Sequence, residues 1–110
     1  MNAITPPINP VYRQIVLPLA QYYDDPNTVE VRLNKPGQII VDRRGEGKQL
    51  IVDENLTQAA IEQLCKSLSN VRGLNFDPDN NPILSTALDE GHRFECLVGP
   101  SVRSGLSLAI

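Results

Sequence analysis

The sequence predicts an α+β domain in which an antiparallel or mixed sheet of about six strands has helices packed on one face. Three observations lead to this prediction. Two groups of short segments alternate apolar and polar residues, as half-buried strands do. One long segment between these groups repeats its apolar residues with the period of a helix. Most connections are short and rich in Gly, Pro and Asp. Strands grouped before and after a helix, with hairpin-length links, are typical of this class.

The composition fits one compact domain and argues against several classes of binding protein. The chain has 110 residues, of which 41% are hydrophobic and 21% charged, within the usual range for one folded domain. Its net charge of −3 gives no overall attraction to nucleic acid or anionic lipid, so we expect no direct nucleic-acid partner. The longest run of apolar residues and proline, Ile15 to Ala20, is far shorter than the roughly 20 residues that span a bilayer. We therefore expect a cytoplasmic domain.

The N-terminal segment is expected to be a flexible tail. Residues 1–16 contain three prolines and little apolar periodicity. The folded domain is expected over residues 17–110, with no boundary to a second domain. We predict that it begins with a short helix, in which Pro18 occupies the first turn and which ends near Asp24, because Pro26 follows.

Three strands in a meander are predicted next. The first alternates Val29, Val31 and Leu33 with polar residues, which is the period of a strand with one buried face. Lys35-Pro36-Gly37 supplies a turn, and a polar segment with two glycines, residues 43–48, supplies the second hairpin loop. The strands themselves are expected at residues 29–34, 38–42 and 49–52.

The clearest helix in the sequence follows this meander. Asn55 or Thr57 can cap its start, and Gly73 can end it in a left-handed conformation. We expect one face of this helix to pack on the sheet, because its apolar residues recur at helical spacing. These residues are Leu56, Ala60, Ile61, Leu64, Cys65, Leu68 and Val71.

The last third of the chain predicts three further strands, at residues 83–88, 93–98 and 106–110. Cys96 falls in this group, whereas the other cysteine, Cys65, falls in the preceding helix. No CxxC spacing links them. We therefore expect two buried free thiols rather than a disulfide or a zinc site.

No catalytic or nucleotide-binding motif can be read from the residues alone. A phosphate-binding loop needs the pattern GxxxxGK[ST]. The nearest stretch, Gly45-Glu46-Gly47-Lys48, is followed by Gln49, so we interpret it as a hairpin loop. His92 is the single histidine, which leaves no Ser–His–acid triad and favours a turn-end residue over a metal ligand. The chain by itself is therefore expected to be inactive.

Four stretches occur in an order that resembles a known family. That family is the N-terminal domain of the hexameric traffic ATPases of type IV secretion and conjugation. In it, a short helix ending in Asp-Pro leads to a Glu-containing strand, an Asn-x-Pro-Gly turn, a helix, then Pro-x-Leu-Ser and Gly-x-Arg. The stretches here are Leu17-Pro18-Leu19 with Tyr22-Tyr23-Asp24-Asp25-Pro26, Val29-Glu30-Val31 with Asn34-Lys35-Pro36-Gly37, Asn81-Pro82-Ile83-Leu84-Ser85, and Gly91-His92-Arg93.

The resemblance implies an assembly domain that stacks in a ring above a ring of RecA-like ATPase domains, a domain that this chain lacks. The full-length parent is then expected to be a homo-hexameric ATPase that uses ATP and Mg²⁺, whereas the fragment alone binds no cofactor. Such a protein would power substrate translocation or pilus assembly at the cytoplasmic face of the bacterial inner membrane, in peripheral membrane contact. Its expected partners are other secretion-system ATPases and inner-membrane components. The Arg of Gly-x-Arg maps to Arg93, which the resemblance implies is a nucleotide phosphate contact.

One residue departs from the family pattern. Glu95 stands where the family more often has a neutral polar residue, and on a strand it shares a face with Arg93 and can pair with it. Arg93 as a phosphate contact therefore competes with Arg93 as an ordinary strand residue paired to Glu95. Two alternatives to the assembly domain also stay open: a standalone adaptor or scaffold module, and the related domain of a type II secretion or type IV pilus ATPase.

Overall fold

The fold is seen in a computed structural model, which describes residues 9–99 and 105–110. The predicted α+β class and its six strands are confirmed, with two helices beside them. In chain order the elements are α1 (Pro10–Tyr23), β1 (Thr28–Lys35), β2 (Gln38–Arg43), β3 (Gly47–Val52), α2 (Gln58–Arg72), β4 (Ile83–Ala87), β5 (Arg93–Val98) and β6 (Leu106–Ala109).

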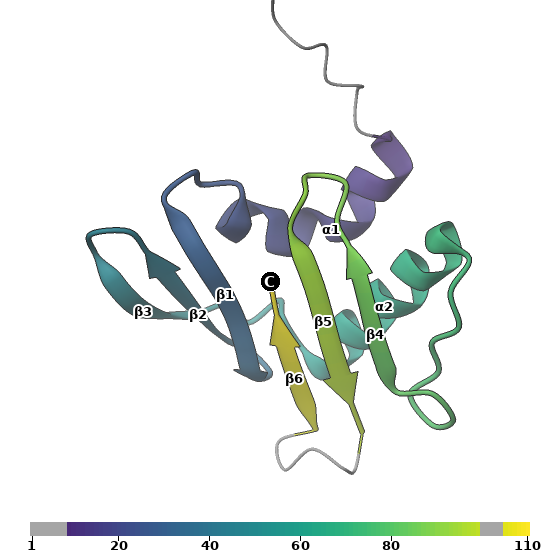
Figure 1. The fold of residues 1–110 in the computed structure, drawn as a ribbon. Coiled ribbons are helices and arrows are strands. Elements are labelled where there is room, and N and C mark those ends of the chain that lie inside the picture. Colours follow the sequence, from purple (N-terminus) through teal and green to yellow (C-terminus); the bar gives the residue numbers. More distant parts are fainter. Residues whose placement is uncertain (1–8, 100–104) are drawn as a thin grey trace, which may run out of the picture.

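The strands form one antiparallel sheet in the order β3-β2-β1-β6-β5-β4 (Figure 1). The last strand, β6, lies between β1 and β5, and so joins the two meanders. Arg32 pairs with Ala109 across β1 and β6. Next to this pair, Val31 and Ile110 exchange backbone hydrogen bonds of 3.0 and 2.9 Å. The C-terminal strand is thus an internal part of the sheet.

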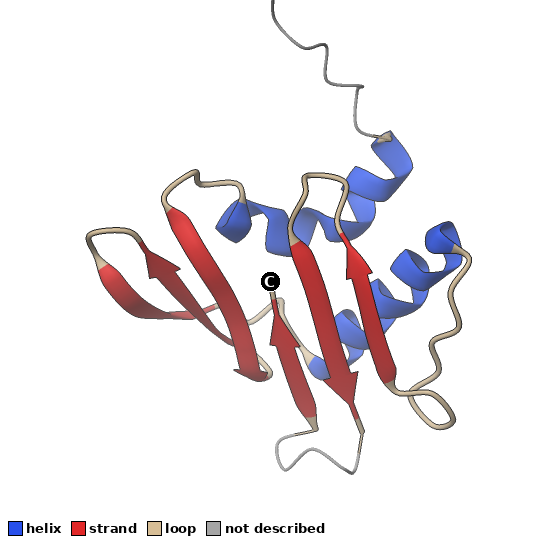
Figure 2. Cartoon of the chain, viewed as in Figure 1, coloured by secondary structure: helices blue, strands red, loops and turns tan. Residues whose placement is uncertain are grey.

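Both helices lie on one face of the sheet (Figure 2). Strand side chains alternate between the two faces; in β5, Phe94, Cys96 and Val98 are buried, whereas Arg93 and Glu95 are exposed. The sheet therefore has one covered face, which holds the core, and one face that no described helix covers, called the open face below. Neither described helix is both long and apolar enough to cross a membrane.

Helix α1 begins earlier than the sequence predicts. It starts at Pro10, with the Asn9 side chain accepting a 2.8 Å hydrogen bond from the Val11 N–H. The expected flexible tail over residues 1–16 is therefore wrong for residues 10–16, and residues 1–8 lie outside the described part of the chain. The error came from Pro18: a proline in a helix's first turn is common, but here Pro18 lies inside the helix.

Helix α2 has the predicted caps and a narrower buried face than predicted. Thr57 accepts a 3.1 Å hydrogen bond from the Ala60 N–H, and Gly73 ends the helix with a φ of 67°. Ala60 and Val71, which were expected on the core face, are exposed. At 3.6 residues per turn, these two positions fall on the flank of the stripe centred on Leu68. The buried stripe consists of Ile61, Leu64, Cys65, Leu68 and Ser69.

The turn between β1 and β2 anchors the segment that leads into α2. Gly37 has a φ of 77°, a conformation that costs other residues energy. Its N–H donates a 2.7 Å hydrogen bond to the Leu56 carbonyl, and its own carbonyl accepts a 2.9 Å bond from the Asp53 N–H. The Asn-x-Pro-Gly turn therefore closes the hairpin and also positions the start of α2.

Candidate functional site

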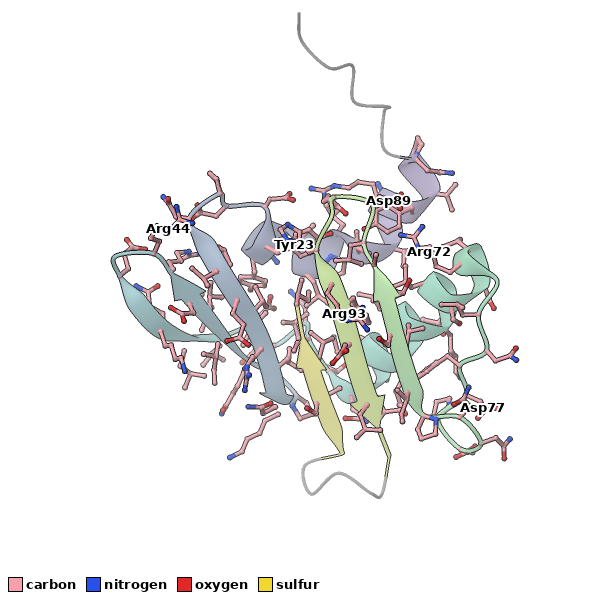
Figure 3. All side chains as sticks on the ribbon, in the orientation of Figure 1. Tyr23, Arg44, Arg72, Asp77, Asp89 and Arg93 are labelled. Atoms are coloured by element: carbon pink, nitrogen blue, oxygen red, sulfur yellow. The ribbon has the colours of Figure 1, made fainter. Side chains whose placement is uncertain are left out.

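Arg93 is the first residue of β5 and lies on the open face of the sheet (Figure 3). Its side chain is 73% exposed. The Nη2 group donates a 3.0 Å hydrogen bond to Ser85 Oγ, and Nε donates a 3.2 Å bond to Glu95 Oε1. The predicted pairing of Arg93 with Glu95 is thus confirmed. The predicted role of Arg93 as a phosphate contact stays a prediction.

The ion pair between Arg93 and Glu95 contributes little to folding. Both side chains are more than half exposed, at 73% and 59%, and exposed ion pairs are worth about 0–1 kcal/mol. Neither residue supports the core, so a change at either position is expected to act on surface chemistry rather than on stability.

A hollow of about 340 Å³ lies beside this pair on the open face. Ser85, Glu95, Ser107 and Ala109 contribute to its wall. Three of these side chains are small, and two carry hydroxyl groups that can donate hydrogen bonds to an anion. The open face therefore offers room next to Ser85 and Glu95, the two side chains to which Arg93 donates.

Arg93 is preceded by a turn that is fixed by Glu90. This carboxylate accepts hydrogen bonds from the hydroxyl groups of Tyr12 and Tyr23, the latter at 2.8 Å. Nη1 of Arg13 donates a third bond, at 2.5 Å, and its side chain also pairs with Asp24. The Glu90 side chain is only 13% exposed. Three side chains of α1 thus converge on one carboxylate of the β4–β5 turn.

Helix α2 holds the same turn from its other side. Nη2 of Arg72 donates hydrogen bonds to Asp89 Oδ1 at 2.6 Å and to the Ala87 carbonyl at 3.0 Å. Its guanidinium also lies over the ring of Tyr12, 5.0 Å from the centroid, a favourable cation–π distance. Tyr23, Arg72 and Asp89 are marked near this end of the sheet in Figure 3. The position of the β4–β5 turn is therefore set by both helices.

The cluster around Glu90 changes the acidity of its members. Burial raises the pKa of Tyr12 to about 12, and the hydrogen bond to Glu90 adds to this rise. Burial likewise raises the pKa of Tyr23. Desolvation acts to raise the pKa of Glu90, but the bonds donated by Tyr12 and Tyr23, with that from Arg13, hold it below its usual range. At neutral pH the phenols are protonated and Glu90 is ionised.

Sequence reasoning missed most of this cluster. Tyr12 and Arg13 fall in the segment that was expected to be a flexible tail. The signal that could have placed them in a helix is Asn9 followed by Pro10, an N-cap with proline at the first helical position. His92 was expected to be a turn-end residue, and it contacts the Tyr23 ring edge-on, 5.2 Å between centroids.

Other candidate chemistry finds no support in the described residues. Both cysteines are buried free thiols, as predicted, and a hydrogen bond with Cys96, together with burial, raises the pKa of Cys65. Within residues 9–99 and 105–110, no group of three or more His, Cys, Asp or Glu side chains could hold a metal ion.

A second cavity, of about 590 Å³, lies between α1 and the segment that joins β3 to α2. No described cation lines it, and Asp53 contributes a carboxylate to its wall. That carboxylate accepts a 2.6 Å hydrogen bond from the Tyr22 hydroxyl. The lining also includes the amide side chains of Gln14, Gln21 and Asn55, but no described cation offsets the Asp53 carboxylate, whose charge repels phosphate. The open face is the better candidate.

The fold, the order of motifs and the exposed arginine of Gly-x-Arg all fit the resemblance to the traffic ATPases of type IV secretion and conjugation. No family model matches the chain. It is nevertheless homologous to the VirB11 and TrbB proteins. It is 31% identical over 104 residues to the protein VirB11 of Agrobacterium fabrum. It is also 36% identical over 80 residues to the conjugal transfer protein TrbB of Rhizobium radiobacter.

These relatives are much longer than the chain. The VirB11 match covers 94% of this chain and 29% of the relative, and the TrbB match covers 72% and 24%. A solved structure, the VirB11 ATPase from the Brucella suis type IV secretion system in complex with sulphate, has the same fold, with a TM-score of 0.76 and 23% identity. That likeness covers 90% of this chain and 30% of the other. The chain thus matches less than a third of a traffic ATPase.

Proposed function

We propose that this chain is the N-terminal assembly domain of a hexameric type IV secretion or conjugation ATPase. The observation that supports this most directly is homology to VirB11 over 94% of the chain, although the chain spans only 29% of that relative. In the whole protein, an ATPase domain would hydrolyse ATP with Mg²⁺ and drive substrate translocation or pilus assembly. The domain would contribute contacts between subunits.

The whole protein would lie at the cytoplasmic face of the inner membrane, in peripheral contact with it. There it would meet other secretion-system ATPases and inner-membrane components. The names of the relatives, VirB11 and conjugal transfer protein TrbB, support a type IV secretion or conjugation ATPase over a type II secretion or type IV pilus ATPase.

Within the hexamer, Arg93 would contact the nucleotide phosphates. Its guanidinium is exposed on the open face, where an ATPase domain can approach the sheet. Arginine suits this role because its planar N–H groups can bind phosphate oxygens in pairs. The turn that precedes it is held by both helices, so the Arg93 backbone is kept in a fixed position.

The test of this role is Arg93→Ala in the full-length protein, measured by steady-state ATP hydrolysis. We expect a loss of at least about tenfold in kcat/KM for ATP, the size expected for one charge-assisted contact. Arg32→Ala is the matched control, because Arg32 is also exposed on the open face and also pairs with a glutamate, Glu30. An equal loss in both variants, or in neither, would contradict the assignment to Arg93.

The assembly role is tested by sedimentation velocity of the full-length protein over a range of concentrations, with and without ATP and Mg²⁺. We expect ring-sized particles. A protein that stays monomeric and does not hydrolyse ATP would favour the adaptor or scaffold alternative.

A further inference from the structure

Three side chains on the open face form a closed triangle of hydrogen bonds. Arg93 donates from Nε to Glu95 at 3.2 Å and from Nη2 to Ser85 at 3.0 Å. The Ser85 hydroxyl in turn donates to Glu95 Oε1 at 3.5 Å. Ser85 and Glu95 are direct cross-strand partners in β4 and β5. The triangle is therefore fixed by the register of the sheet.

The triangle uses the edge of the guanidinium that a phosphate group would need. Nε–H and one N–H of Nη2 point in the same direction, and this pair binds two oxygens of one phosphate or carboxylate group side by side. In this structure Glu95 and Ser85 hold these two donors. A phosphate that approaches this edge must first displace the Glu95 carboxylate.

We infer that Glu95 is a built-in counter-ion that competes with phosphate for Arg93 and so weakens the affinity of the open face for polyphosphate ligands. This inference rests on the proposed function, in which Arg93 contacts the nucleotide phosphates. Displacement alone does not remove the competition, because Glu95 stays on the same strand face, two residues from Arg93. Its negative charge then repels the bound phosphate.

The surroundings of the triangle suit a bound phosphate once the carboxylate is neutralised. The hollow beside it has a volume of about 340 Å³ and is lined in part by Ser107 and Ala109. Ser85 can keep its hydrogen bond to Nη2 or donate its hydroxyl proton to a phosphate oxygen. The cost of opening the Arg93–Glu95 pair is small, because both side chains are more than half exposed.

The same face provides a matched control pair. In β1, Arg32 Nε donates to Glu30 Oε1 at 2.7 Å, with the same spacing of two residues along the strand. Glu30→Gln and Glu95→Gln change the net charge of the chain equally. Only the second removes a charge next to Arg93.

The experiment is an NMR titration of the ¹⁵N-labelled chain, residues 1–110, with sodium tripolyphosphate at pH 7 and low salt. The Arg93 side-chain Nε–H signal reports binding at the guanidinium, and the backbone amide signals of residues 85 and 95, which are present in every variant, give the affinity. We expect Glu95→Gln to tighten binding about fivefold, which corresponds to about 1 kcal/mol. Glu30→Gln is expected to change the affinity less than twofold. The gain from Glu95→Gln should shrink when the ionic strength is raised, since salt screens charges at an exposed site.

Arg93→Ala, alone and combined with Glu95→Gln, separates this inference from the proposed role of Arg93. If Arg93→Ala weakens binding but Glu95→Gln does not tighten it, the counter-ion inference is wrong and the role of Arg93 stands. If the double variant binds as tightly as Glu95→Gln alone, the phosphate does not bind Arg93, and that role is wrong as well. A Glu95→Gln variant that shows no tripolyphosphate binding also overturns the inference, because neutralising Glu95 would have opened no anion site.

Discussion

The hydroxyl of Tyr23 donates a 2.8 Å hydrogen bond to Oε2 of Glu90, although the two residues are 67 positions apart in the chain. Tyr23 is the last residue of α1, and Glu90 lies in the turn between β4 and β5. The bond therefore connects the helix layer to the turn that leads into Arg93. Because Tyr12 and Arg13 bind the same carboxylate, one residue determines how this part of the sheet packs against α1.

Glu90→Gln is expected to destabilise the fold by about 1.5–3 kcal/mol. Glutamine keeps the size of the side chain, but it removes the charge that strengthens three donated hydrogen bonds, and it turns an NH₂ group toward the donors of Tyr12, Tyr23 and Arg13. Urea unfolding at pH 7 and 25 °C, followed by circular dichroism, measures the free energy of unfolding.

Glu46→Gln is the control for this measurement, because Glu46 is exposed in the loop between β2 and β3. We expect it to change the free energy of unfolding by less than about 0.5 kcal/mol. Equal stabilities of the Glu90→Gln and Glu46→Gln variants would show that the hydrogen bonds to Glu90 contribute nothing to folding.

The stabilising effect of Glu90 is expected to disappear in acid. Its pKa is held below the usual range in the folded protein, so its contribution is present above the unfolded pKa, about 4.3. It is lost as the pH falls through the folded value, where Glu90 becomes protonated. The difference in unfolding free energy between the native chain and Glu90→Gln should therefore be largest near pH 7 and shrink below about pH 4. A difference that stays constant from pH 7 to pH 3 would contradict this reading.

Local patterns in the sequence predict the elements of this fold well. The alternation in β1 and the helical repeat in α2 follow from burial of one face, and Thr57 and Gly73 cap α2 as their chemistry predicts. The order of the strands in the sheet could not be predicted in this way. The position of β6 between β1 and β5 depends on pairing between distant segments, and no local pattern in the sequence indicates it.

In the candidate site, too, features set by neighbouring residues could be predicted and contacts between distant segments could not. Arg93 and its partner Glu95 could be placed on one face from the period of a strand, because they are two residues apart. The Glu90 cluster could not be predicted, since its hydrogen bonds join residues 67 to 78 positions apart. Two of its members, Tyr12 and Arg13, also lie in the part of α1 that was predicted to be a flexible tail.

Gly37→Ala is expected to destabilise the fold by about 1–2 kcal/mol. A Cβ at this position would meet nothing closer than the Asp53 carbonyl oxygen at 3.7 Å, an ordinary contact, so the cost comes from the positive φ of 77°. Gly37→Asn should cost less, because asparagine adopts this conformation more readily. The order glycine, asparagine, alanine in thermal unfolding midpoints would confirm the cause; an alanine variant as stable as the native chain would exclude it.

Pro18→Ala is expected to stabilise the chain by about 1–2 kcal/mol. Pro18 lies inside α1 and has no N–H to donate to the Gln14 carbonyl, and proline costs about 3 kcal/mol in a helix interior. Part of the gain is offset, because the unfolded chain becomes more flexible without proline. Gln14→Ala, which changes helix propensity but no backbone hydrogen bond, is the control and should shift stability by less than about 0.5 kcal/mol. Chemical unfolding measures both variants. A loss of stability in Pro18→Ala would contradict this prediction, because it would mean that proline supports α1 at this position.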